Sequence, residues 1–152
     1  MLSKLFETDE AWSLLVLRVF LGVVMFPHGA QKIFGWFGGY GFAGTLAGFT
    51  DKMHIPWFFA LLAILAESLG SWGLMIGLLS RVAAFGILCN MTVAIWMVHW
   101  PHGFFMNWRG AQKGEGIEYH LLAIAISIAV ILAGGGKWSV DRAIAKFLGE
   151  NR

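Results

Sequence analysis

Residues 12–34 read WSLLVLRVFLGVVMFPHGAQKIF, a stretch that is apolar at most positions. A helix of about 20 such residues crosses the hydrocarbon core of a membrane. Three further apolar stretches follow at residues 57–79, 82–100 and 118–133. The sequence therefore predicts four membrane-spanning helices, and we expect residues 1–152 to form a single transmembrane domain.

The composition indicates the same class of protein. Hydrophobic residues make up 58% of the chain and charged residues 13%, whereas globular proteins average about half apolar and a quarter charged. We expect an all-α fold, a membrane-embedded four-helix bundle, with the lipid bilayer around it. The net charge of +2 gives no reason to expect a nucleic acid partner.

The regions outside the spans predict topology and two short helices. Lys and Arg are more frequent in the tails and the turn at residues 80–81 than in the outer loops, which favours both termini in the cytoplasm. Apolar residues at helical spacing predict an interfacial helix over residues 42–53, after a Gly-rich stretch. A tail helix is expected at residues 140–148, with Ser139 as its cap.

Polar side chains interrupt the apolar spans. A charged residue at the centre of a span costs about 3 kcal/mol on insertion scales and needs a partner or a function. Counting about 1.5 Å per residue from the span ends places four polar residues in one broad layer. This buried polar layer consists of Arg18, Glu67, Asn90 and Ser127. We predict an ion pair between Arg18 and Glu67 with Asn90 bridging, as a structural clamp or as a site that handles protons or orients a ligand.

A second set of polar residues lies within about 10 Å of the outer edge by the same count. It includes histidines from three different spans, and histidine both carries protons near neutral pH and binds metals. The candidate ligand-binding residues are His28, Gln31, Lys32, His99, Glu118, Tyr119 and His120.

Several interpretations of this outer set remain open. No pair of metal ligands at helical spacing and no C-x-x-C-H motif occurs, so we expect neither a metal nor a haem. A quinone or another small redox ligand would be hydrogen-bonded by histidine, Gln31 or Tyr119 and packed against aromatic rings. The histidines could instead only cap helices and contact lipid headgroups. Because Cys89 is the only cysteine, a redox role would need a bound cofactor or a partner protein.

Two charged residues lie on the cytoplasmic side. Arg81 begins the third span, and Asp141 is near the start of the tail helix. A contact between Arg81 and Asp141 would dock the tail against the bundle. The alternative is two independent solvated charges.

The order and spacing of several motifs resemble the DoxX family over residues 14–142. The motifs are His28-Gly-Ala-Gln-Lys32-Ile-Phe-Gly35, Ala66-Glu67-Ser-Leu-Gly70, Gly77-Leu-Leu-Ser-Arg81-Val-Ala-Ala84, the loop Asn107-Trp-Arg-Gly-Ala-Gln-Lys-Gly-Glu-Gly116, Glu118-Tyr-His-Leu-Leu122 and Gly134-Gly-Gly-Lys-Trp-Ser-Val-Asp141. Ser68 and Leu69 stand where the family more often has a Gly-Gly pair.

The resemblance implies a four-helix bundle of the bacterial-type inner membrane. It also implies a link to quinone-dependent oxidation of sulfur compounds and to oxidative-stress complexes. The family's recurring polar residues correspond here to His28, Gln31, Lys32, Glu67, Arg81, His99, Glu118 and Asp141.

Together these observations lead to a functional hypothesis. The chain would be a small inner-membrane subunit that binds a quinone-like redox ligand near its outer face and acts with partner oxidoreductases. His28, His99 and Lys32 would contact the ligand, and Tyr119 would stack on it or donate a hydrogen bond. Arg18 and Glu67 would tune charge or relay protons. The alternatives are a scaffold or chaperone of a membrane redox complex without a ligand of its own, and a small-solute carrier.

Overall fold

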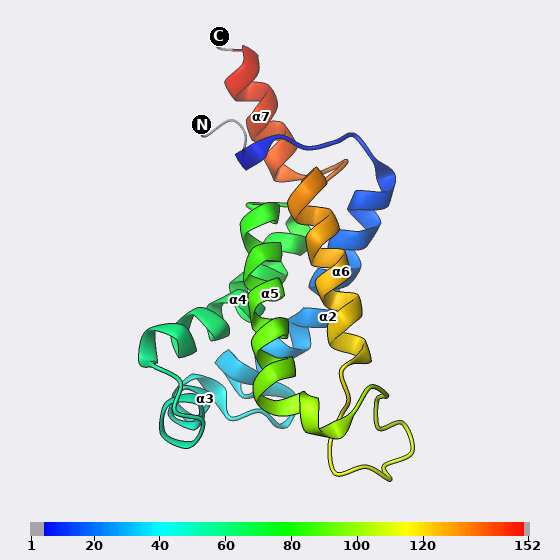
Figure 1. The fold of residues 1–152 in the computed structure, drawn as a ribbon. Coiled ribbons are helices and arrows are strands. Elements are labelled where there is room, and N and C mark those ends of the chain that lie inside the picture. The colour runs from blue at the N-terminus through cyan, green and yellow to red at the C-terminus, as the bar shows by residue number, and fades with distance from the viewer. Residues whose placement is uncertain (1–4, 151–152) are drawn as a thin grey trace.

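The computed structural model describes residues 5–150, and all the regular structure within them is helical (Figure 1). The main helices run in alternating directions and pack into a bundle, which confirms the expected all-α fold. They are α2 (Trp12–Phe34), α4 (Trp57–Ile76), α5 (Ser80–Ala94) and α6 (Glu118–Ala133). Both ends of the described chain lie at the same end of the bundle (Figure 1), where Asp9 N donates to Ala133 O at the end of α6 at 2.9 Å.

Three segments in the described chain are long and apolar enough to cross a membrane: α2, α4 and Ser80–His102. The last consists of α5 extended by a π-helical turn, η3 (Ile95–His99), and a 3₁₀ turn, η4 (Trp100–His102). With 16 residues, α6 is shorter, about 24 Å long. The second span ends at Ile76 rather than at residue 79 because Gly77 and Leu79 have positive φ angles of 75° and 50°.

The short helix expected over residues 42–53 is present. It consists of α3 (Gly41–Ala47), which continues without a break into a π-helical turn, η2 (Gly48–Lys52). A 3₁₀ turn, η1 (Trp36–Gly38), precedes them. The tail helix, α7 (Val140–Glu150), extends two residues past the expected end at residue 148. The Ser139 hydroxyl accepts a hydrogen bond from Arg142 N at 3.2 Å, so the predicted cap is confirmed.

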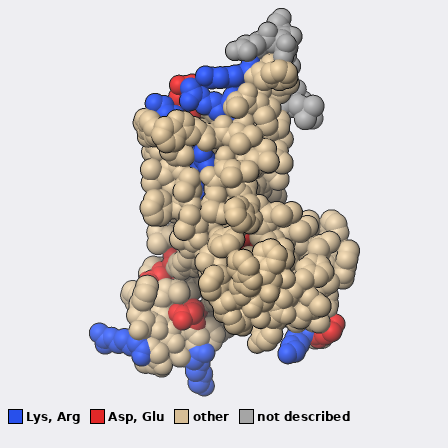
Figure 2. All heavy atoms as spheres, turned by 180° about the vertical axis from the view of Figure 1, so that it is seen from behind, with Lys and Arg blue, Asp and Glu red and all other residues tan. Residues whose placement is uncertain are grey.

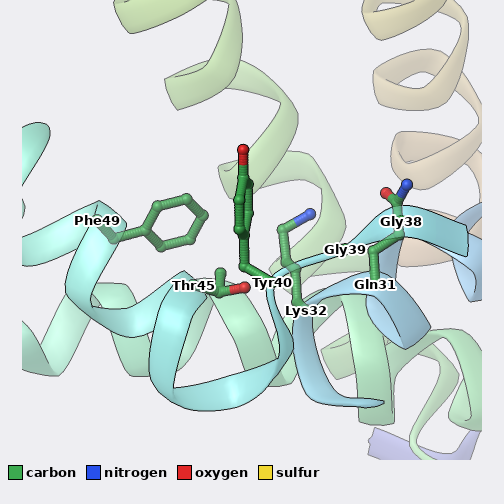
Figure 3. A pocket seen from close by; sticks show the side chains of 7 residues that line it. All are labelled: Gln31, Lys32, Gly38, Gly39, Tyr40, Thr45 and Phe49. Atoms are coloured by element: carbon green, nitrogen blue, oxygen red, sulfur yellow. The ribbon is translucent and has the colours of Figure 1, made fainter. Parts of the chain in front are cut away.

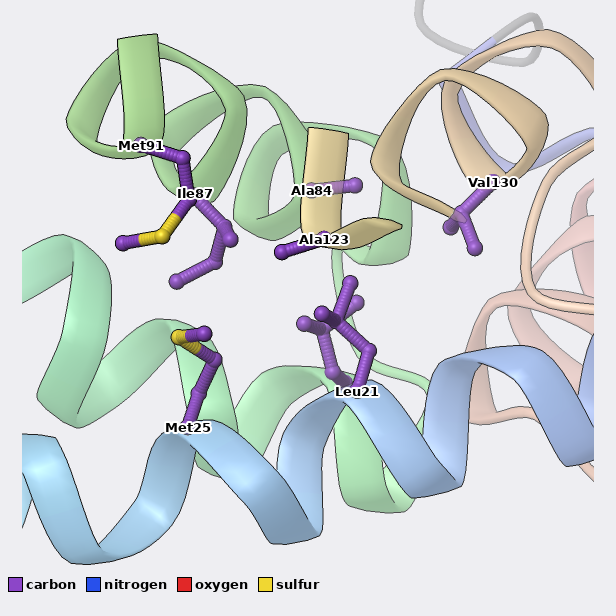
Figure 4. Packing of buried hydrophobic residues seen from close by; sticks show 8 residues of the cluster. Leu21, Met25, Ala84, Ile87, Met91, Ala123 and Val130 are labelled. Atoms are coloured by element: carbon purple, nitrogen blue, oxygen red, sulfur yellow. The ribbon is translucent and has the colours of Figure 1, made fainter. Parts of the chain in front are cut away.

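A cluster of buried apolar side chains lies between the four main helices (Figure 4). Its small members, Ala84 on α5 and Ala123 on α6, face the larger side chains of α2 and leave space for them. The cluster consists of Leu21, Met25, Leu74, Ala84, Ile87, Met91, Ala123 and Val130.

The outside of the bundle is apolar as well. Phe20, Leu69 and Leu132 are 64%, 63% and 73% exposed. Figure 2 shows charged side chains gathered at the two ends of the molecule, with a broad, largely uncharged band between them. Lipid tails solvate such a band, whereas water would not. The chain is therefore a membrane protein.

Glycines on α2 allow a close crossing with α4. A Cβ atom added at Gly29 would lie 2.5 Å from the carbonyl oxygen of Glu67, and one at Gly22 would lie 2.8 Å from that of Ser71. Small residues let membrane helices approach to backbone contact in this way. Residue 29 of α2 is thus level with residue 67 of α4, which sets the register of every side chain between these helices.

We expect Gly29→Ala to lower the free energy of unfolding by about 1–3 kcal/mol, because the added methyl group overlaps the backbone of α4. Gly48→Ala is a matched control: Gly48 has helical φ and ψ angles of −59° and −43°, and an added Cβ meets no atom within 4 Å. That control should be neutral or slightly stabilising. Thermal unfolding in detergent measures both changes, and equal midpoints for the two variants would contradict the close crossing.

Candidate functional site

A buried ion pair joins α2 and α4 near the end of the bundle opposite α7, here called the outer end after the expected topology. Lys32 Nζ donates to Glu67 Oε2. The carboxylate also accepts from Asn90 Nδ2 at 2.8 Å through Oε1, and Asn90 Nδ2 donates in addition to the Ala63 carbonyl at 3.1 Å. The side chain of Glu67 is only 8% exposed and that of Lys32 is 19% exposed. Three helices therefore converge on one carboxylate.

The predicted ion pair between Arg18 and Glu67 is wrong. Gly29 is level with Glu67, and residue 18 lies about 16 Å further along α2. The prediction counted depth from the ends of the spans and so assumed that α2 and α4 begin and end at the same levels. In the structure Gly29 is level with Glu67, so Lys32, less than one helical turn further along α2, is the cation within reach of the carboxylate.

Arg18 lies instead at the end of the bundle that holds α7. It is 1% exposed, and its guanidinium donates to five backbone carbonyls. Nη1 bonds to Leu74 O at 2.8 Å and Met75 O at 2.7 Å, in the last turn of α4. The other acceptors are Gly135 O, Lys137 O and Trp138 O, in the loop before α7. A cation suits the carbonyl-rich end of a helix, so Arg18 stabilises the C-terminus of α4 through these carbonyls.

Asp141 holds the tail helix against the start of α5, whereas Arg81 binds the end of α6, and no ion pair joins the two residues in the described chain. The Asp141 carboxylate accepts from Leu79 N at 2.7 Å and Ser80 N at 2.8 Å, at the start of α5. Arg81 donates to the carbonyls of Ile131 and Leu132 at the end of α6. The predicted direct contact is therefore wrong, because each charge binds the backbone of a helix end.

Ser127 does not join the predicted layer either. Its hydroxyl donates to Ala123 O, one turn earlier in its own helix, at 2.8 Å. The layer thus separates into an outer part around Glu67 and an opposite part around Arg18, and Ser127 belongs to neither.

A pocket of about 210 Å³ adjoins the outer ion pair (Figure 3). In this view Phe49 lies on one side of Tyr40, with Lys32 on the other side and Gln31 beyond it. Gln31 Nε2 donates to Phe37 O at 3.2 Å, which holds the loop over the end of α2. The pocket is lined by Gln31, Lys32, Gly38, Gly39, Tyr40, Thr45 and Phe49.

The predicted histidines form a separate cluster of rings between α2, η3 and α6. The ring centroids of His99 and His120 lie 4.1 Å apart, those of Tyr119 and His120 5.4 Å, and those of His28 and Tyr119 6.2 Å. His99 Nδ1 lies 2.9 Å from Glu115 O in the outer loop. His28 lies four residues before Lys32 on α2, on the same face of the helix, so the cluster and the ion pair are neighbours.

The structure therefore divides the seven candidate residues between different places. Gln31 and Lys32 line the pocket. His28, His99, Tyr119 and His120 belong to the ring cluster, whereas Glu118 accepts a hydrogen bond from Trp108 Nε1 at 3.2 Å in the outer loop. Sequence reasoning missed Tyr40, Thr45 and Phe49 as lining residues. The Gly-rich stretch before α3 was the available signal, since glycines mark a backbone that folds back on itself.

The arrangement provides an ammonium group, an amide and two aromatic rings at one pocket. An ammonium group donates hydrogen bonds to carbonyl or anionic oxygens, and aromatic rings stack on planar ligands. The buried carboxylate of Glu67 orients the ammonium group. Such a pocket suits a flat ligand with an oxygen acceptor.

Comparison with known protein families gives a match over more than half of the chain. The model of the DoxX family matches residues 13–100, which include α2, the pocket and the Lys32–Glu67 pair. No curated protein matches the chain, and no solved structure matches it.

Proposed function

The chain belongs to the DoxX family of membrane proteins, and from this premise we propose that it binds a quinone-like redox ligand in the outer pocket. In this proposal it is a subunit that acts with partner oxidoreductases in a bacterial-type inner membrane, with both termini in the cytoplasm. The observation that carries the proposal is the position of the pocket directly on the Lys32–Glu67 pair.

The size of the pocket favours the headgroup of such a ligand. Sites for drug-sized molecules measure about 300–1,000 Å³, whereas this pocket measures about 210 Å³. One flat ring would fit between Tyr40 and Phe49, and an attached isoprenoid tail would remain in the lipid.

The polar groups favour a ligand with ring oxygens. Lys32 Nζ would donate to one oxygen while remaining paired with Glu67, and Gln31 would offer its amide to another. Because the ion pair is held by Asn90, the ammonium group stays in place whether or not a ligand is bound. Preorganised donors of this kind lower the cost of binding.

The ring cluster supports the redox part of the proposal. Reduction of a quinone takes up protons and oxidation of a quinol releases them, so a site for either needs groups that exchange protons. Histidine is the side chain suited to this near neutral pH. His28 lies about one helical turn from Lys32 on α2, and His99 reaches the outer loop.

We expect the purified protein to bind a short-tailed benzoquinone with saturable quenching of its tryptophan fluorescence. Tyr40→Ala combined with Phe49→Ala should weaken binding about tenfold or more, because each aromatic contact contributes about 1 kcal/mol. Phe37→Ala is the matched control, since Phe37 is 65% exposed in the same region but does not line the pocket. Quenching that does not saturate, or equal affinity for all variants, would contradict the proposal.

A further inference from the structure

Two histidine rings from different elements lie against each other at the outer end of the bundle. His99 belongs to η3 and His120 to the first turn of α6, and their ring centroids are 4.1 Å apart with the planes tilted by 43°. Two nitrogens that bind one metal ion at about 2.0–2.1 Å lie at most about 4 Å apart. Rings at the observed separation can meet this condition. The π-helical turn that carries His99 is a rare conformation that occurs frequently at functional sites.

The hydrogen bond of His99 leaves one of its nitrogens free to bind a metal. Its Nδ1 lies 2.9 Å from Glu115 O. A carbonyl oxygen only accepts, so in the neutral ring Nδ1 carries the proton and Nε2 carries a lone pair. Histidines that bind metals almost always donate their other ring N–H to a carbonyl or carboxylate in this way. The side chain of Glu115 also accepts from Asn107 N at 2.6 Å, which holds the residue that orients His99.

His120 contributes a nitrogen that has no partner. The residue is 5% exposed, and its Nδ1 is buried without a hydrogen bond to any described residue. The Gly116 carbonyl lies near the ring but does not bond to Nδ1. Buried polar atoms without a partner are uncommon, and a bound ion is one physical reason for such an atom. The two rings therefore bring together one nitrogen with a lone pair and one without a partner.

The charges around the two histidines do not oppose a cation. The outer loop and the start of α6, residues 103–118, contain Glu115 and Glu118, whose carboxylates accept hydrogen bonds from neutral N–H groups and keep their negative charge. The same segment contains the cations Arg109 and Lys113. Its formal charges therefore balance.

We propose that His99 and His120 form a binding site for a late first-row divalent cation such as Zn²⁺ or Cu²⁺. Imidazole nitrogens suit these metals, whereas Mg²⁺ prefers oxygen ligands. Among residues 5–150, no group of three or more His, Cys, Asp or Glu side chains is arranged to hold a metal ion, so water would complete the coordination. The sequence argued against a metal because no pair of ligands stands at helical spacing. These two ligands come instead from two separate elements.

The bound ion would join the outer end of the third span to the start of α6. The proposal does not rest on the quinone-like ligand, because neither histidine lines the outer pocket. Because ligands that bind the native state stabilise it, Zn²⁺ should raise the thermal midpoint of the wild-type protein.

Isothermal titration calorimetry with ZnCl₂ tests the site in the full-length protein, purified without a histidine tag and freed of metals with a chelator. The wild type should bind about one Zn²⁺ per chain, and excess Mg²⁺ should not compete. His99→Gln and His120→Gln should each lower the affinity about 100-fold, since even the outer-shell partners of metal ligands contribute 10- to 100-fold. His54→Gln, which changes an exposed histidine outside the ring cluster, is the control and should bind as the wild type does.

His99→Gln decides the test even where His120→Gln does not fold, because His99 is only partly buried. A wild-type protein that binds no Zn²⁺, or a His99→Gln variant with wild-type affinity, would overturn the site. A rise of the thermal midpoint with Zn²⁺ in the wild type and in His54→Gln, but not in His99→Gln, would support it. The titration uses no quinone, so it stands whether or not the outer pocket binds the benzoquinone.

Discussion

Replacing Arg18 by methionine is expected to lower the free energy of unfolding by about 3–5 kcal/mol, the largest effect of any single substitution proposed for this chain. The guanidinium is 1% exposed and satisfies five backbone carbonyls from α4 and the loop before α7. Methionine fills a similar volume but donates nothing, so these carbonyls would be buried without partners. Unfolding by denaturant in mixed micelles measures the change.

Two further variants make the result specific. Arg18→Lys keeps the charge but has three donors in place of five. Its free energy of unfolding should therefore lie between that of the methionine variant and that of the wild type. Arg142→Met removes an ion pair with Glu10, which is 59% exposed. Exposed ion pairs contribute about 0–1 kcal/mol, so Arg142→Met should change the free energy of unfolding only slightly. An Arg18→Met protein as stable as Arg142→Met would show that the carbonyl contacts do not stabilise the bundle.

Breaking the Lys32–Glu67 pair from either side should cost about 3 kcal/mol or more, whereas removing both charges should cost less than either single change. Glu67→Gln leaves a largely buried ammonium without its counter-ion, and Lys32→Met leaves a buried carboxylate held only by Asn90. The double variant has neither charge. A double-mutant cycle of unfolding free energies measures the coupling between Lys32 and Glu67. If the losses of the two single variants simply add up in the double variant, the two charges are not coupled and the prediction is contradicted.

The same variants show whether the pair binds the ligand or only holds α2 and α4 together. A double variant that folds as stably as the wild type but no longer binds the benzoquinone would assign the pair to the ligand. A double variant that binds normally would restrict the pair to holding α2 and α4 together. The proposed function predicts the first result, a stable double variant that no longer binds the benzoquinone.

The fold could be predicted because its determinants are local. The length and apolar character of the segments specify the spans, and the αL positions at Gly77 and Leu79 explain why the second helix ends at Ile76. The partner of Arg18 could not be predicted in the same way. A sequence shows which carboxylates exist, but every residue carries a carbonyl, and only the fold shows which carbonyls lie around a guanidinium.

The candidate site was predicted only in part, for a related reason. Lys32 and Gln31 stood out because they are polar residues at the end of an apolar span. Their partners depend on the register between α2 and α4, which is set by the contact of Gly29 with the backbone of Glu67. Tyr40 reaches the pocket through the folding of the Gly-rich loop before α3, which has no periodic pattern in the sequence. The helical spacing that includes Phe49 predicts a helix there but not which residues lie next to its ring.

The most direct test of the central claim is mass spectrometry of the small molecules that co-purify with the protein, together with its absorption spectrum. The account predicts a quinone in extracts of the gently purified wild-type protein and of Phe37→Ala, and a strongly reduced amount in the Tyr40→Ala, Phe49→Ala double variant. A clean blank from the wild-type protein, or the same amount of quinone from every variant, would contradict a quinone-like ligand in the outer pocket.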